Sequence, residues 1–74
     1  MDLDDWENWY KSLKVGDEVM YCLFGNSWKR SRVIKVNKKS LKTTGDMIWR
    51  DGYHNLNKIH VIRLYPVDES MHFV

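Results

Sequence analysis

The sequence predicts a mainly β domain in which a short N-terminal amphipathic helix precedes a small antiparallel barrel of five strands. Apolar residues with helical spacing occur only near the start of the chain. After Gly16, five short runs of β-forming residues follow, separated by turn-forming residues. Closure into a barrel would bury such strands without leaving exposed edges. We therefore divide the single domain 1–74 into a helix at 4–14, a barrel at 15–66 and a C-terminal tail at 67–74.

The first predicted element is the helix from Asp4 to Lys14. Asp2 or Asp4 can cap its start, and Gly16 can adopt the left-handed conformation that ends a helix. Its apolar residues fall at i, i+3, i+4 and i+7 and so share one face, which is too apolar to stay in water. We expect this face to cover an open end of the barrel, or alternatively to bind a partner protein through Trp6, Trp9 and Tyr10. The residues of the face are Trp6, Trp9, Tyr10 and Leu13.

The five strands are predicted from runs of β-forming residues bounded by glycine, asparagine or aspartate. Asp51 and Gly52 form a pair that is typical of the tight turn in a β-hairpin. The polar segment 53–58 is expected to be irregular with one 3₁₀ turn, and Pro66 ends the last strand. The predicted strands are Glu18–Phe24, Trp28–Val36, Ser40–Thr44, Met47–Arg50 and Ile59–Tyr65.

Alternation along the strands predicts which side chains face the core. In the second strand, every other residue up to Val33 is expected to point inward. The apolar Ile34 and Val36 then fall on outward positions. A β-bulge near Ile34 and Lys35 would restore the parity. The side chains expected to point inward are Val19, Tyr21, Ser31, Val33, Met47, Trp49, Ile62 and Leu64, and those expected to point outward are Arg30, Arg32, Ile48 and Arg50.

The order of these motifs resembles SH3-like small β-barrels of the Tudor, agenet and KOW type. The matching stretches are VGDEV, SWKRSRVIKV, MIWRDG and IRLYP, which fall between Val15 and Pro66. The resemblance implies a five-stranded barrel with a 3₁₀ turn before the last strand. Tudor domains also hold methylated lysine or arginine in an aromatic cage, but Tyr21 and Trp49 are expected in the core and Tyr53 follows its glycine rather than preceding it. A methyl-reader function is therefore not carried over to the nearest candidates, Tyr21, Phe24, Trp49 and Tyr53.

The net charge of +2 is unevenly distributed along the chain. Residues 1–18 carry six acids and two lysines, a balance of −4. Residues 19–42 carry seven basic residues and no acid, whereas residues 43–74 carry four acids and three bases. A segregated charge distribution of this kind steers charged partners toward one face.

The basic stretch SWKRSRVIKVNKKSLK, residues 27–42, is the main candidate site. Folded as a hairpin, it would present a continuous positive strip, and phosphate backbones bind such strips irrespective of base sequence. Trp28 either stacks a base or fills the mouth of the barrel. The simpler alternative is a solvated hairpin face whose lysines prevent edge pairing. The residues assigned to nucleic-acid contact are Trp28, Lys29, Arg30, Arg32, Lys35, Lys38, Lys39 and Lys42.

Catalysis is not predicted from this sequence. Cys22, the one cysteine, lies in an apolar strand and is expected to be a small core residue. A single cysteine fits a reducing compartment, so the cytoplasm is the expected location. The three histidines lack the spacing of metal ligands, and neither a metal nor a cofactor is expected. No apolar run approaches the roughly 18 residues that span a bilayer, and the acidic start is unlike a signal peptide.

Two functions remain open at this point. The first is a non-enzymatic module that contacts DNA or RNA electrostatically, with weak sequence specificity. The second is a protein-interaction module, of the kind that phages use to modulate or inhibit host proteins, acting through the basic strip or the acidic aromatic helix. In both, we expect a monomer or weak dimer with no membrane and no small-molecule substrate as partner.

Overall fold

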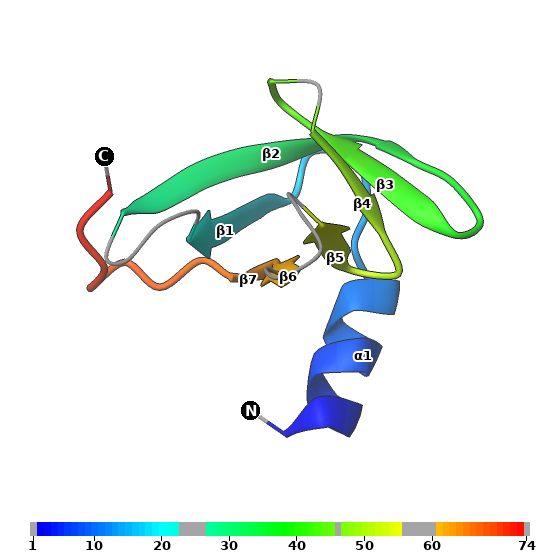
Figure 1. The fold of residues 1–74 in the computed structure, drawn as a ribbon, viewed down its shortest axis with the longest axis horizontal. Helices are drawn as coiled ribbons and strands as arrows, with labels where there is room; N and C mark the ends of the chain where they lie inside the picture. The colour runs from blue at the N-terminus through cyan, green and yellow to red at the C-terminus, as the bar shows by residue number, and fades with distance from the viewer. Residues whose placement is uncertain (1, 23–26, 46, 56–60, 74) are drawn as a thin grey trace.

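The computed structural model describes residues 2–22, 27–45, 47–55 and 61–73. Within these residues the chain forms one helix and seven strand segments, arranged as in Figure 1. The elements are α1 (Leu3–Lys11), β1 (Glu18–Cys22), β2 (Trp28–Val36), β3 (Ser40–Thr43), β4 (Met47–Arg50), β5 (Tyr53–Asn55), β6 (Val61–Arg63) and β7 (Tyr65–Pro66).

The strands from β1 to β5 form an antiparallel meander in which sequence neighbours are also neighbours in space. β6 adds to the meander beside β5, and β7 adds beside β1. The predicted mainly β fold with an N-terminal helix and antiparallel strands is therefore confirmed. The predicted closure is not, because the last stretch of chain changes partner at Leu64 and hydrogen bonds do not close the sheet into a barrel.

The segment after the Asp51–Gly52 turn differs from its prediction. Asp51 and Gly52 have φ values of 50° and 83°, as the two central residues of a type I′ turn require. The turn brings Tyr53 opposite Arg50, and the chain continues as β5 instead of an irregular loop. Pairing with β6 holds this segment in a strand, although Asn55 has a weak β propensity. The predicted 3₁₀ turn, and the predicted strand ends at Phe24 and Ile59, lie outside the described residues.

β2 contains the predicted β-bulge. The register passes from Val33 opposite Thr43 to Lys35 opposite Lys42, so Ile34 has no counterpart in the ladder. Val36 then lies opposite the buried Leu41, which means that the bulge restores the inward parity. Ile34 and Val36 nevertheless stay 44% and 47% exposed.

The core forms where the inner face of the sheet meets the residues that follow α1. All the side chains expected to point inward are buried except Met47, which is half-buried and packs against the same cluster. The buried indole of Trp49 donates from Nε1 to Thr43 Oγ1 at 3.0 Å, which satisfies both polar groups inside the core. The core cluster consists of Leu13, Val19, Tyr21, Val33, Leu41, Trp49, Ile62 and Leu64.

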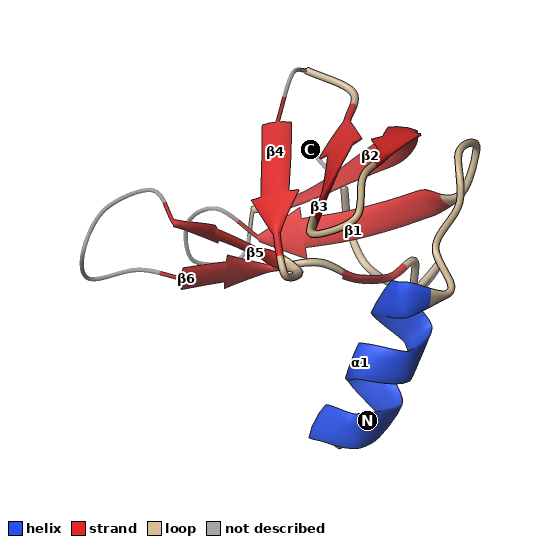
Figure 2. Cartoon of the chain, turned by 90° about the vertical axis from the view of Figure 1, so that its right-hand side faces the viewer, coloured by secondary structure: helices blue, strands red, loops and turns tan. Residues whose placement is uncertain are grey.

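The helix packs one aromatic face against the sheet and projects away from it (Figure 1, Figure 2). It begins after Asp2, whose Oδ1 accepts from the Asp5 amide at 2.8 Å, and it ends at Lys11, earlier than predicted. Trp6 is only 3% exposed, and its Nε1 donates to the Leu64 carbonyl at 2.7 Å. The hydroxyl of Tyr10 donates to the Trp49 carbonyl at 3.1 Å. These two bonds anchor α1 to β4 and to the link between β6 and β7.

Candidate nucleic-acid interface

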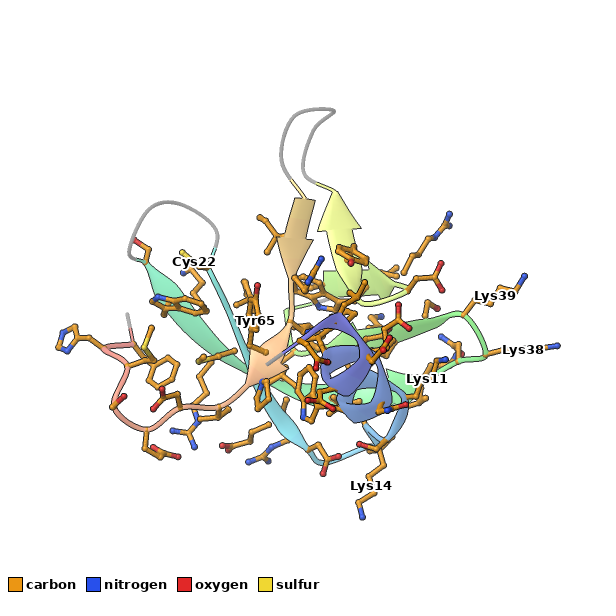
Figure 3. All side chains as sticks on the ribbon, turned by 90° about the horizontal axis from the view of Figure 1, so that it is seen from below. Lys11, Lys14, Cys22, Lys38, Lys39 and Tyr65 are labelled. Atoms are coloured by element: carbon orange, nitrogen blue, oxygen red, sulfur yellow. The ribbon has the colours of Figure 1, made fainter. Side chains whose placement is uncertain are left out.

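The predicted basic residues fall into three groups along the β2–β3 hairpin. The first group begins β2, the second occupies its middle, and the third surrounds the far end of the hairpin. Figure 3 shows Lys38 and Lys39 pointing away from the body of the molecule, whereas Cys22 lies on its opposite side. In chain order the groups are Trp28 and Lys29; Arg30 and Arg32; and Lys35, Lys38, Lys39 and Lys42.

The middle group is held by carboxylates of this same chain. The Arg30 guanidinium pairs with Glu18 through Nε at 2.8 Å and through Nη2. It also pairs with Glu69 through Nη1 at 3.2 Å and Nη2 at 3.0 Å, while Arg32 Nη2 lies 3.4 Å from Glu18 Oε1. The hydrogen bonds from Arg30 and Arg32 hold the pKa of Glu18 below its ordinary value. Although both arginines are exposed, their charges are largely balanced by two acids.

The C-terminal tail brings the second acid to this position. Trp28 and Phe73 form an isolated parallel bridge, and the Arg30 guanidinium lies 5.6 Å from the centre of the Phe73 ring. Met71 and Phe73 are both half-buried. The tail therefore covers part of the outer face of β2 and divides the expected continuous strip.

The third group differs from the middle group in its partners. Lys35 and Lys42 lie directly opposite each other across the hairpin. Lys38 and Lys39 follow in the exposed turn. Within the described part of the chain, Lys35, Lys38 and Lys39 make no ion pair. This end of the hairpin is the part of the predicted strip that offers cations to an anionic partner.

Two further cations lie near this end, and the sequence analysis did not assign them to the site. Arg50 is an exposed residue of β4 and lies opposite Ser40 of β3. It follows the buried Trp49 and so points outward, on the same face as Lys42. That alternation was a usable signal. Lys11 lies on the side of α1 that faces Lys38 and Lys39 (Figure 3), and no local pattern in the sequence indicated this.

Trp28 lies away from the third group. It begins β2, and the eight steps to Val36 correspond to roughly 25 Å along an extended strand. Its half-buried ring meets Tyr65 edge-on, with the ring centres 6.0 Å apart, and it lines a shallow hollow with Cys22 and Arg63. Lys29 is half-buried beside it, opposite Tyr21. Trp28 and Lys29 therefore do not join the lysines at the far end in one surface.

The aromatic residues considered for partner binding or for an aromatic cage pack within this domain where the structure describes them. Trp6 is buried, and Trp9 and Tyr10 are half-buried against the sheet, so they do not form an exposed patch. Tyr21 and Trp49 lie in the core, as their parity predicts. Among the cage candidates, Phe24 lies outside the described residues, and Tyr53 is half-buried, with its hydroxyl accepting from Arg63 Nη2 at 2.6 Å.

Cys22 is half-buried at the end of β1 rather than fully enclosed in the core as expected. Among the described residues, no three histidine, cysteine, aspartate or glutamate side chains are placed to hold a metal ion. No described helix is long and apolar enough to cross a membrane.

Comparison with models of protein families, with curated proteins and with solved structures found no match to this chain. The assignment of a function therefore depends on the charge and geometry of the chain itself.

Proposed function

We propose that the protein is a small non-enzymatic binding module of the SH3-like barrel type that contacts DNA or RNA through the far end of its β2–β3 hairpin. The fold assignment is supported by the meander from β1 to β5 and by residues 61–66, which supply the strand segments at both of its edges. The proposed contacts are Lys35, Lys38, Lys39, Lys42 and Arg50, with Arg30 and Arg32 contributing less.

The observation that carries the proposal is the group of exposed lysines at the far end of the hairpin. Lys35, Lys38 and Lys39 are exposed and make no ion pair within the described part of the chain, and Lys42 and Arg50 add positive charge nearby. A phosphate backbone complements such a group of cations, and each phosphate that they neutralise releases its condensed counterions. Binding through such contacts is insensitive to base sequence.

Arg30 and Arg32 have a secondary part in this proposal. A phosphate that approaches Arg30 has to compete with the carboxylates of Glu18 and Glu69, which already accept hydrogen bonds from the guanidinium. Charge-assisted bonds of this kind are stronger than neutral ones, so their loss offsets much of the gain from a new phosphate contact. The interface is therefore shifted toward the hairpin tip relative to the strip expected from the sequence.

The experiment is fluorescence anisotropy with labelled mixed-sequence DNA and RNA, single-stranded and duplex, between about 50 and 200 mM salt. We expect affinity to fall steeply with salt. In Lys38→Gln/Lys39→Gln the slope of log K against log salt should decrease by about 0.7 to 0.9 for each phosphate that these lysines no longer neutralise. Lys14→Gln, in the loop after α1, is the charge control and should behave as wild type. Absence of binding to every probe at low salt would show that the proposal is wrong.

An acidic helix surface is the observation that favours the alternative, a protein-interaction module. Asp4, Asp5 and Glu7 are all exposed on α1, and a basic partner surface would complement them. A pull-down from lysate with and without nuclease separates the two functions. A protein partner that survives nuclease and is lost in Asp4→Asn/Asp5→Asn would support the alternative, whereas loss of all captured material on nuclease treatment supports nucleic-acid binding.

A further inference from the structure

A cleft of about 360 Å³ separates α1 from the end of the β2–β3 hairpin. Its volume falls within the range of about 300 to 1,000 Å³ that is common for ligand sites. The floor is apolar and aromatic, and Val36 contributes a side chain that is 47% exposed although it faces inward. The residues of the floor are Trp6, Tyr10, Leu13, Val36 and Leu41.

The rim of the cleft carries more cations than acids. Lys11 comes from α1, and Lys38 and Lys39 come from the hairpin turn, so the cations stand on both sides of the cleft (Figure 3). Glu7 and Asp51 also line it, which leaves one net positive charge among the lining side chains. The amide of Asp51 donates to the Lys39 carbonyl at 3.3 Å, so the β4–β5 turn supports the hairpin tip.

Neutral polar groups complete the lining. Asn37 and Ser40 lie at the base of the hairpin turn, with Asn37 Nδ2 and Ser40 Oγ 3.4 Å apart. At that separation the side-chain bond is weak, so both groups keep the capacity to bond a ligand. The hydroxyl of Tyr10 already donates to Trp49, and it is the apolar body of the tyrosine that the cleft contains.

We propose that this cleft binds one unpaired base of a single-stranded nucleic acid, with the flanking phosphates held by Lys11, Lys38 and Lys39. The inference rests on the proposed function and specifies its substrate class. A base combines a flat apolar body, which suits the floor, with polar edges, which suit Asn37 and Ser40. Its phosphates carry the charge that the rim complements. A duplex keeps its bases paired and stacked, so it can fill the cleft only if one base is unpaired and extruded, which costs free energy.

The test compares single-stranded and duplex oligonucleotides of the same sequence by anisotropy, with two matched tryptophan variants. Val36→Trp fills the cleft from an exposed position without changing charge. Val15→Trp makes the same kind of change at a residue that is 64% exposed and does not line the cleft. We expect Val36→Trp to lose about tenfold or more in affinity for the single strand, in line with the energy of stacking one base, and to bind the duplex as wild type does. Val15→Trp should match wild type with both probes.

A second variant keeps the inference testable if Val36→Trp fails to fold, as judged by circular dichroism. Lys11→Gln alters an exposed side chain on α1 and should lower the affinity for the single strand more than the affinity for the duplex. If wild type binds both probes and each variant changes the two affinities equally, the cleft inference is wrong and the proposed function stands. If wild type binds neither probe at low salt, the proposed function itself fails. Binding of an acidic peptide that Val36→Trp abolishes, with single-strand affinity unchanged, would assign the cleft to a protein partner instead.

Discussion

The indole ring of Trp6 lies directly over the α-carbon of Gly52, so that the helix and the β4–β5 turn meet without an intervening side chain. A Cβ placed at position 52 would overlap the ring and lie 2.8 Å from its Cζ2 atom. The same glycine has a φ of 83°, which side-chain-bearing residues rarely adopt. The docking of α1 therefore depends on one glycine for two independent reasons, and these can be separated.

Substitution of two glycines with the same φ distinguishes packing from backbone strain. Gly45 and Gly52 both have a φ of 83°, but nothing lies within 4 Å of a Cβ added at Gly45. Gly45→Ala should cost about 1 kcal/mol for the left-handed conformation alone. Gly52→Ala should cost about 1 to 3 kcal/mol more, because the Trp6 ring has to move. Urea denaturation measures both, and equal losses would contradict the packing of Trp6 on Gly52.

The buried hydrogen bond from Trp6 to Leu64 is the subject of a second prediction. Trp6→Phe keeps an aromatic ring but leaves the buried Leu64 carbonyl without its donor, which should cost about 1 to 3 kcal/mol of stability. Trp9→Phe is the control, because Trp9 is half-buried and its indole makes no hydrogen bond among the described residues. The free energy of unfolding should fall clearly more for Trp6→Phe. A similar loss in both variants would mean that ring size, and not the hydrogen bond, decides the effect.

The ion pairs of Glu18 predict a pH dependence of stability. Hydrogen bonds from Arg30 and then Arg32 lower its pKa in the folded protein below the ordinary 4.5. The stabilisation is therefore complete above pH 4.5 and is lost as the pH falls through the lowered pKa. Thermal unfolding of Glu18→Gln should show a shallower loss of Tm with acidification than wild type. Glu7→Gln, which removes a carboxylate that makes no ion pair among the described residues, should retain the wild-type slope; identical profiles for all three proteins would refute the prediction.

Neutralising the acid that the tail places on Arg30 should strengthen nucleic-acid binding. Glu69→Gln weakens the competition for the Arg30 guanidinium and removes one negative charge beside the hairpin. We expect a severalfold gain in affinity at low salt that shrinks as screening increases. Asp68→Asn makes the same charge change one residue away, on a carboxylate that accepts hydrogen bonds from Ser70 and not from Arg30. Equal gains in the two variants would show that net charge alone is responsible.

Features that depend on neighbouring residues were predictable. The alternation of Val19, Ser31 and Trp49 with polar residues indicated the inner face of the sheet, and the parity change at Ile34 indicated the bulge. Asp51-Gly52 indicated its turn because few residue pairs tolerate two positive φ values. The amphipathic face of α1 likewise indicated that Trp6 packs against the sheet.

The division of the basic strip could not be predicted from neighbouring residues. Arg30 meets Glu69 across a sequence separation of 39 residues, and Trp6 meets Leu64 across 58, so no local pattern connects either pair. The strand β5 was also missed, because its pairing with β6 and not its polar composition decides its structure. By itself the sequence determined the helix, most of the strands, the Asp51–Gly52 turn and the inward faces, since these follow from steric and hydrophobic preferences of adjacent residues. Only the tertiary structure decided which cations stay uncompensated and where a cleft lies, because both depend on which distant side chains the packing of α1 and the tail brings together.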